Sequence, residues 1–164
     1  NMAKNDVRIV DFGGHNTIPT LTWQTEAAAT AIYAGEPVKL KAAGSPYAIP
    51  LADGEPVVGT TTVVLGIAAS DSTQTASADG TVEVYVPLNG VIYEANAKTA
   101  STVDSQSEIN ALCGDRVVFD LTSSTYTVDA AATDGATKGI YVLGGDAVKT
   151  VKFSMRDDAT FLSA

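Results

Sequence analysis

This sequence contains only one histidine, His15, and only one cysteine, Cys113. One cysteine excludes an intrachain disulfide, and one cysteine with one histidine cannot supply the ligand set of a structural zinc site. A nucleophilic triad needs a base that is firmly held beside its serine or cysteine. His15 lies in the glycine-rich residues 13–16, and Cys113 ends the apolar face of a short helix. We therefore predict an exposed loop histidine and a small core cysteine rather than catalytic groups.

Loops that bind phosphate or calcium are missing as well. The Gly-Lys-Ser/Thr motif never occurs, and no G-x-G-x-x-G run precedes a helix. Residues 129–135 supply only two acids, at the wrong spacing for a calcium loop. The carboxylate pairs that could serve glycoside hydrolysis lie at turn signals or, being adjacent, on opposite strand faces; they are Asp157 with Asp158, Asp129 with Asp134 and Glu36 with Glu55. The sequence predicts no enzyme activity, no metal site and no cofactor.

Positive charge and long apolar runs are also scarce. Ten Lys and Arg stand against 19 Asp and Glu, which gives a net charge of −9. Nucleic-acid binding depends on clustered cations, and an acidic surface is repelled by anionic membranes, so we expect neither partner. A locally basic protein would suit this charge. No apolar run approaches the roughly 20 residues of a membrane span, and residues 1–10 lack the apolar stretch of a signal peptide. We expect the protein in the cytoplasm or in particles assembled there.

Strict alternation of apolar and polar residues is what the sequence has in quantity. A period of two places alternate side chains on opposite faces of a sheet. The clearest examples are residues 38–42, 82–86, 117–121 and 151–155. Shorter strand candidates are residues 47–50, 63–69, 91–94, 125–128 and 140–143. The predicted fold class is all-β, mainly antiparallel, as a barrel, a β-tulip-like domain or a sandwich, with one short helix.

Turn signals separate these strands. Asn89-Gly90 lies between two strand candidates and favours a type I′ hairpin, across which Tyr85 and Tyr93 would pair. Further turns are predicted at Asp53-Gly54, Asp79-Gly80, Asp134-Gly135 and Gly144-Gly145. A Gly-acidic-x-Val motif recurs at Gly35, Gly54 and Gly114, each time before a predicted strand.

The one predicted helix lies between residues 105 and 114. Ser105 and Glu108 have the spacing of a capping box, and Gly114 can end the helix in the left-handed conformation. Ile109, Leu112 and Cys113 share its apolar face. Such a helix commonly covers the open end of a barrel or sandwich.

The N-terminal segment has no clear alternation. We interpret residues 1–25 as an extended N-terminal arm and residues 26–164 as a single β-rich domain. Pro19 restricts any strand in the arm to a sheet edge, so a frayed terminus with one edge strand is the alternative. Trp23 is either an anchor for a partner's pocket or a core tryptophan. The candidate partner-binding residues are the apolar ones of the arm, Val7, Ile9, Phe12, Ile18, Leu21 and Trp23. If the arm carries binding, deleting residues 1–24 leaves a folded domain that no longer attaches to its partner.

Four motifs follow one another between Gly35 and Ala97. They are GEPVKL at residues 35–40, VVLGIA at 63–68, GTVEVYV at 80–86 and NGVIY at 89–93. This layout resembles small head decoration, or cement, proteins of tailed phages, and it spans under half of the chain. The composition, rich in alanine and threonine and poor in cysteine, is also similar to that of virion surface proteins. Residues after Gly114 match no pattern of a known family.

The resemblance implies a β-barrel-like or β-tulip domain, often trimeric, at threefold positions of an expanded capsid. The implied partner is the major capsid protein, and the implied location is the capsid surface of the virion, assembled in the host cytoplasm. The family carries no catalytic residues. An extended arm could add a strand to a coat-protein sheet, where backbone hydrogen bonds give affinity. Repetition around a threefold axis would make such contacts collectively tight.

Two other functions without catalysis remain open. A carbohydrate- or receptor-binding fibre or tail module would need its aromatic side chains clustered on one exposed face, whereas Trp23 and the six tyrosines are spread along the chain. A self-assembling shell component would form large particles instead of a discrete monomer or trimer.

Overall fold

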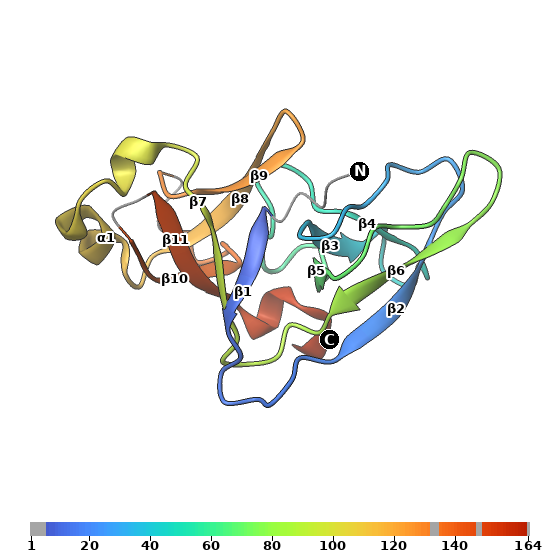
Figure 1. Cartoon of the computed structure of the whole chain (residues 1–164), viewed down its shortest axis with the longest axis horizontal. Coiled ribbons are helices and arrows are strands. Elements are labelled where there is room, and N and C mark those ends of the chain that lie inside the picture. Colours follow the sequence, from blue (N-terminus) through green and yellow to red (C-terminus); the bar gives the residue numbers. More distant parts are fainter. Residues whose placement is uncertain (1–5, 132–134, 147–148, 164) are drawn as a thin grey trace.

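Two antiparallel sheets make up the fold of this computed structural model, which describes residues 6–131, 135–146 and 149–163 (Figure 1). The six-stranded sheet has the order β1 (Val7–Asp11), β7 (Ile92–Asn96), β11 (Thr150–Met155), β10 (Ile140–Asp146), β8 (Arg116–Thr122), β9 (Thr125–Asp129). The five-stranded sheet has the order β2 (Thr20–Thr25), β6 (Gly80–Tyr85), β5 (Val64–Ala68), β3 (Pro37–Leu40), β4 (Ala48–Pro50). The predicted all-β, mainly antiparallel class with one short α-helix is confirmed. The two sheets fit the sandwich alternative, and the strands described here close no barrel.

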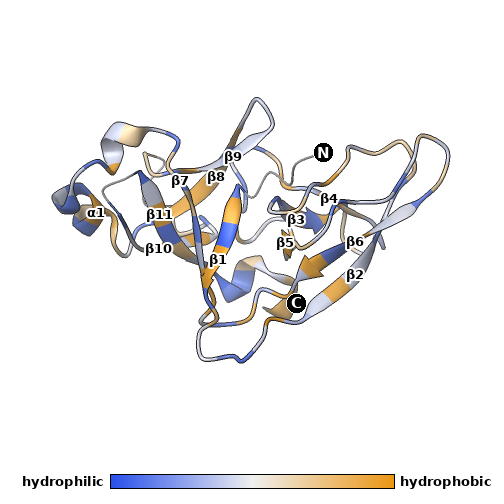
Figure 2. Ribbon diagram, in the orientation of Figure 1, coloured by the Kyte–Doolittle hydropathy of each residue, from blue (hydrophilic) through white to orange (hydrophobic). Residues whose placement is uncertain are grey.

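The alternating segments form strands that bury their apolar face. In β6 the side chains of Val82 and Val84 are 1% exposed, and in β11 Phe153 is fully buried. Apolar residues therefore follow the strands of both sheets (Figure 2). The buried side chains fall into two clusters. One includes Tyr93, Phe119 and Phe153 of the six-stranded sheet, and the other gathers residues of the five-stranded sheet, such as Val82.

In each sheet, an isolated parallel bridge links two segments that are not neighbours in the strand order. In the five-stranded sheet a parallel bridge joins Gln24 of β2 to Tyr47, just before β4. In the six-stranded sheet a parallel bridge joins Ala97, just after β7, to Val128 of β9. The strand β1 lies outside this second connection, and among the described strands it pairs with β7 alone. It is therefore an edge strand, and Figure 1 shows it between the two sheets.

Residues 51–58 connect the two sheets. The backbone N–H of Leu51 donates to Pro37 in β3 (2.9 Å), while that of Phe119 in β8 donates to Glu55 (2.8 Å). In the part of the chain that the structure describes, strands β8 and β10 pair at two positions. Beyond them, Gly54 and Glu55 bond to Phe119 of β8, and the Pro56 carbonyl accepts from Gly139, just before β10. This segment fills the space where the two strands diverge.

The predicted hairpin at Asn89-Gly90 is wrong. Gly90 adopts φ +86°, but Asn89 has no positive φ, and the turn leads from one sheet to the other. The reason is that Tyr85, the last residue of β6, already pairs with Thr20 on one side and Ile67 on the other. Strand β7 therefore cannot pair with β6. Tyr85 and Tyr93, expected to face each other, belong to different sheets.

The structure contradicts one further turn prediction, at Gly144-Gly145, and leaves another, at Asp134-Gly135, undescribed. Gly144-Gly145 lies inside β10, where the register with β11 shifts between Val142 and Gly144, so the predicted turn is a strand irregularity. Asp134 of the predicted Asp134-Gly135 turn, and of the carboxylate pair with Asp129, lies outside the described residues.

The helix is confirmed as α1 (Gln106–Leu112) with both hydrogen bonds of its capping box. The Ser105 side chain accepts from the Glu108 backbone, and the Glu108 carboxylate accepts from the Ser105 backbone. Ile109 is buried. Cys113 was predicted as a core residue and is exposed instead. Because the helix ends at Leu112, position 113 has left the apolar face.

The Gly-acidic-x-Val motif is a recurring turn. Its glycines Gly35, Gly54 and Gly114 adopt φ of +88°, +73° and +93°. In each copy the backbone N–H of the acidic residue donates three residues back, to the carbonyls of Tyr33, Ala52 and Leu112. The first and third copies lead into β3 and β8, as predicted, whereas the second lies within residues 51–58 and leads directly into none of the described strands.

The tightest hairpin joins β8 to β9 through Ser123-Ser124. Thr122 pairs with Thr125, and both serines have positive φ, 51° and 62°. A two-residue loop of this kind is a type I′ turn, for which Asn-Gly is preferred. A residue other than glycine pays roughly 1–2 kcal/mol in the left-handed region. The sequence offered no signal for this hairpin because serine is not typical of that conformation.

The double substitution Ser123→Asn with Ser124→Gly is therefore expected to raise the free energy of unfolding by about 1 kcal/mol. Urea unfolding of the two proteins measures the difference. Ser77→Gly is the control, since Ser77 is exposed but has no positive φ, and it should leave stability unchanged or slightly lower. If Ser77→Gly stabilised the protein as much as the double substitution does, the conclusion that Ser123 and Ser124 are strained would be wrong.

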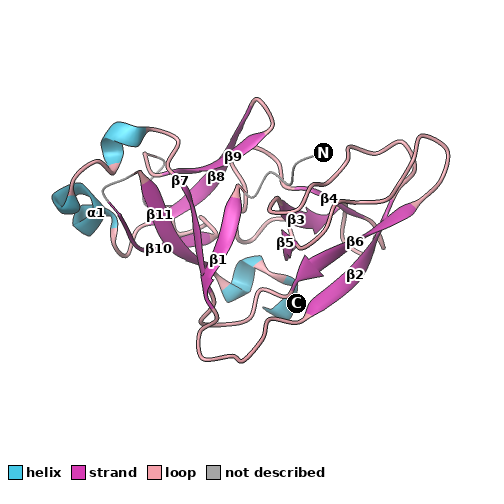
Figure 3. Cartoon of the chain, in the orientation of Figure 1, coloured by secondary structure: helices cyan, strands magenta, loops and turns pink. Residues whose placement is uncertain are grey.

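The N-terminal segment is not a separate arm. Strand β1 pairs with β7 in one sheet, and β2 pairs with β6 at six positions in the other. The loop of residues 12–19 joins them (Figure 3). The edge position predicted from Pro19 holds, because β2 begins at Thr20 and is the outer strand of its sheet. Each strand finds a partner distant in the sequence, which local patterns cannot indicate.

Candidate functional site

An open cleft of about 720 Å³ lies between the two sheets. One wall comes from β1 and the loop after it, and the other from residues before β3 and at the ends of β5 and β6. Its lining residues are Val7, Arg8, Ile9, Phe12, Thr17, Ile18, Ala34, Gly35, Ile67, Ala68, Ala69 and Tyr85. This volume falls in the range of about 300–1,000 Å³ that ligand pockets occupy, and the lining is mostly apolar.

The free edge of β1 borders the cleft. The backbone N–H of Val7 points away from β7 and donates to the carbonyl of Gly35 (3.1 Å). Alternate residues of a strand direct their backbone groups to the same side. Ile9 therefore turns its N–H and C=O toward the same side as Val7, and no described residue bonds to the Ile9 N–H there. The cleft thus contains an unused stretch of strand edge.

The loop that closes one side of the cleft is held tightly. Gly13 has φ +62°, and a Cβ at this position would lie 2.3 Å from the carbonyl carbon of Gly90. The Gly13 N–H donates to the Asp11 carboxylate (2.7 Å), and a ring nitrogen of His15 lies 3.1 Å from the Asn89 carbonyl oxygen. Residues 13–16 therefore form a fixed turn against the loop before β7. His15 is exposed, as predicted.

Charge is distributed unevenly around the cleft. Among the described residues that line it, Arg8 alone is charged, and its guanidinium forms an ion pair with Glu94. Two carboxylates flank the lining: Asp11 precedes Phe12, and Asp71 accepts from the backbone N–H of Ala34 (2.9 Å). The cleft therefore has an apolar interior with acidic groups at its margins.

Four of the six predicted partner-binding residues line this cleft: Val7, Ile9, Phe12 and Ile18. Val7 is buried at 3% exposure, whereas Phe12 is 45% exposed.

The other two predicted residues lie elsewhere. Leu21 is on β2 and 43% exposed. Trp23 packs edge-on against Phe161, with ring centroids 5.7 Å apart, and contacts the core cluster of the five-stranded sheet. The core alternative for Trp23 is therefore the correct one.

The opposite wall was missed from the sequence. Ala68 and Tyr85 are the last residues of β5 and β6, Ala69 follows β5, and Ala34 lies in the loop before β3. Alanines carry no signal for a binding site, and only the pairing of distant strands brings them opposite β1.

Other chemical groups are engaged in ordinary contacts. Across the described ranges, no three His, Cys, Asp or Glu side chains gather closely enough to hold a metal ion. Asp158 pairs with Arg156 (2.6 Å), and Asp129 lies 3.2 Å from the Lys98 ammonium. None of the helices in these ranges has the length and apolar character needed to cross a membrane.

The aromatic side chains form no exposed platform. Tyr93, Tyr126, Phe119 and Phe153 are at most 2% exposed and contact one another within the six-stranded sheet. Burial raises the pKa of both tyrosines well above the ordinary value. Among the described aromatic residues, only Phe12 and Tyr141 are exposed; Phe12 lies in the loop after β1, whereas Tyr141 lies in β10.

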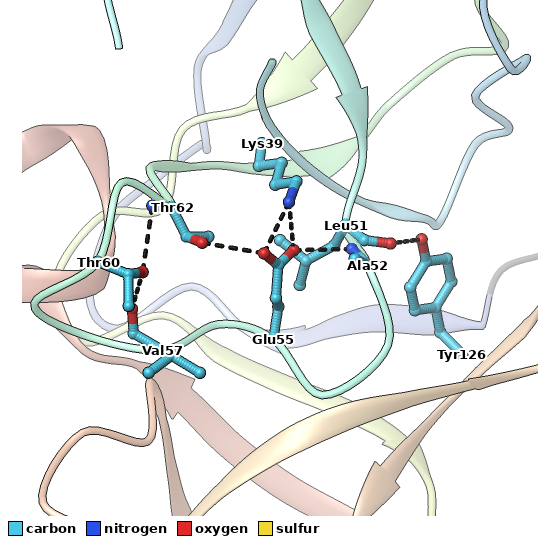
Figure 4. A network of polar contacts seen from close by, with 8 residues as sticks. All are labelled: Lys39, Leu51, Ala52, Glu55, Val57, Thr60, Thr62 and Tyr126. Atoms are coloured by element: carbon cyan, nitrogen blue, oxygen red, sulfur yellow. Dashed lines mark hydrogen bonds and ion pairs between the residues drawn. The ribbon is translucent and has the colours of Figure 1, made fainter. Parts of the chain in front are cut away.

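Glu55 is the centre of a polar network beside the junction of the sheets (Figure 4). Its carboxylate accepts from Lys39 (2.7 Å), the backbone N–H of Ala52 (2.8 Å) and the Thr62 hydroxyl (2.9 Å). Burial alone would raise the pKa of Glu55, but these hydrogen bonds together hold it below its ordinary value. The network fixes residues 51–58, and the nearby Tyr126 hydroxyl donates to the carbonyl of Leu51.

Glu55→Gln is expected to lower the free energy of unfolding by about 1–3 kcal/mol at pH 7, because it removes the charge that Lys39 faces in a mostly buried site. The Lys39 and Glu55 side chains are only 15% and 17% exposed. A carboxylate with a lowered folded-state pKa stabilises the protein above its unfolded pKa of ~4.3 and loses that contribution as the pH falls through the folded value. The difference between the two proteins should therefore narrow below about pH 4.

Glu26→Gln is the matched control for this experiment. Glu26 pairs with Lys41 at the surface, where the side chains are 40% and 46% exposed. Exposed pairs contribute roughly 0–1 kcal/mol. Denaturant unfolding between pH 3 and pH 7 compares the variants, and equal losses for both would contradict a special role of the Glu55 network.

No protein-family model matches this chain, and no curated protein matches it either.

Proposed function

We propose that this chain is a non-enzymatic capsid decoration protein that binds the outer surface of a tailed-phage head. In this proposal it stabilises contacts between subunits of the major capsid protein, acts as a homotrimer and resides on the virion. The observation that carries the proposal is the apolar cleft between the sheets, bordered by a free strand edge and by the exposed Phe12. Such a surface suits adhesion to another protein.

The arrangement of the resembling motifs supports the proposal. GEPVKL contains β3, VVLGIA contains β5, GTVEVYV contains β6 and NGVIY leads into β7. The first three motifs form neighbouring strands of one sheet, and β7 is the partner of β1 at the cleft. The residues that carry the resemblance thus build the scaffold on which the candidate site rests.

The N-terminal strands add exposed apolar surface. Val10 and Phe12 are 44% and 45% exposed, and Leu21 on β2 is 43% exposed. Buried apolar side chains at the centre of an interface supply most of its binding energy. The net charge of −9 favours a partner with a basic surface.

Binding to phage heads tests the proposal directly. Heads of the phage that encodes this chain are prepared without it, mixed with the purified protein and separated by gradient sedimentation. We expect saturable co-sedimentation at a fixed ratio to the capsid protein, with added density at threefold positions by electron microscopy. Absence of the protein from the head fraction would refute the proposal, and large particles formed by the protein alone would favour a shell component.

A further inference from the structure

We infer that the cleft between the sheets receives an extended segment of the major capsid protein, which pairs with the free edge of β1 as an added strand. This inference rests on the proposed function and specifies how the partner is held. Here the capsid protein adds a strand to a sheet of the decoration protein. The sequence instead suggested that the N-terminal arm of the decoration protein adds a strand to a capsid-protein sheet.

The backbone of β1 supplies the first argument. Val7 is joined to Gly35 on the cleft side, and Ile9, two residues on, offers its N–H and C=O in the same direction. The pairing with β7 shifts register between Ile9 and Asp11, so the strand bends after this point. An edge strand with unpaired backbone groups binds extended peptides through main-chain hydrogen bonds.

The shape of the cleft supplies the second argument. The wall facing β1 is built from small residues, including Ala34, Gly35 and Ala69, which leave room for an additional backbone. Ile67 and Tyr85 pair directly across β5 and β6, so their side chains share one face of the five-stranded sheet, and both line the cleft. A strand lying on this face would bury alternate side chains there and expose the others.

The charge at the margins of the cleft indicates which kind of segment binds there. Arg8, the one cationic side chain among the described lining residues, is neutralised by Glu94. Asp11 and Asp71 lie at the margins, and the net charge of the whole chain is −9. The segment that complements this cleft has apolar residues at alternate positions and lysine or arginine on its flanks. An acidic segment would be repelled.

The first experiment uses overlapping 12-residue peptides that cover the major capsid protein, each labelled with a fluorophore. Anisotropy titrations should find one region with alternating apolar residues and basic flanks that binds the full-length chain. In an isotope-labelled protein, the amide signal of Ile9 should shift on binding. Failure of all peptides to bind, or binding without a change at Ile9, would overturn the inference.

The second experiment blocks the cleft. Ala69→Trp fills it from the wall opposite β1, and Ile9→Pro removes the unpaired N–H while sparing the hydrogen bonds to β7. Each should weaken binding of the selected peptide and of heads at least tenfold. Ala76→Trp, the same change in an exposed loop outside the cleft, should bind as the unmodified protein does. Circular dichroism shows which variants are folded. If one of the two cleft variants misfolds, the other still tests whether the cleft is needed for binding.

The outcomes separate the two proposals. If the unmodified protein fails to bind heads, the proposed function is wrong. If it binds heads and the folded Ala69→Trp protein binds them equally well, decoration stands and the cleft is not the docking site.

Discussion

Deletion of residues 1–24 is expected to abolish the cooperative fold rather than merely detach a docking segment. The deletion removes β1 and nearly all of β2, and with them the edge strand of each sheet. Val7 is buried in the larger core cluster, and Trp23 packs against Phe161 at the other. A domain is stable by only about 5–15 kcal/mol, which the loss of two strands exceeds. Thermal unfolding followed by near-ultraviolet circular dichroism should show no sharp transition.

Deletion of residues 1–5 is the control, since it leaves every described strand in place. This shorter deletion should unfold cooperatively, close to the full chain. A sharp transition after removal of residues 1–24 would instead restore the arm hypothesis and show that β1 and β2 are dispensable.

Gly66→Ala is expected to lower the free energy of unfolding by about 4 kcal/mol, the sum of backbone strain and overpacking, each of roughly 1–3 kcal/mol. Gly66 lies in β5 with φ +137°, a conformation that side chains rarely adopt. A Cβ there would lie 2.0 Å from the carbonyl oxygen of Tyr85 in β6. Strands β5 and β6 would have to separate, and the wall of the cleft at Tyr85 would move with them.

Gly59→Ala separates the two contributions. Gly59 also has a positive φ, +80°, but a Cβ at this position would meet nothing within 4 Å. It should cost only about 1 kcal/mol, the backbone penalty alone. Urea unfolding of both variants measures the gap, and equal losses would mean that the close approach to Tyr85 is relieved at no cost.

Local patterns predicted the elements whose signals lie within a few residues. The alternation of Val82 and Val84 identified β6, and Ser105 with Glu108 identified the start of α1. The Asn89-Gly90 signal failed because a turn motif does not say which strands are free to pair. Both edges of β6 are occupied, by β2 and β5, so the chain after Gly90 continues into the other sheet.

Four of the twelve residues that line the candidate site could be predicted from the sequence. The apolar residues Val7, Ile9, Phe12 and Ile18 were chosen because they cluster in one segment, and they do line the cleft. The opposing wall depends on how β5 and β6 meet β1, which is a property of the sheet topology. No local feature of Ala34 or Ala69 distinguishes them from the many other alanines of this chain.

The position of β1 also has a consequence for the order in which the protein is made. Arg8 leaves the ribosome 86 residues before its partner Glu94, and β11, the next strand of that sheet, follows later still. The strands of the five-stranded sheet, by contrast, have all been synthesised once Tyr85 has emerged. Because contacts that close long loops form slowly, this half should be able to fold during translation while the nascent β1 waits unpaired. During that interval the apolar residues of β1 would be exposed to chaperones and to neighbouring nascent chains.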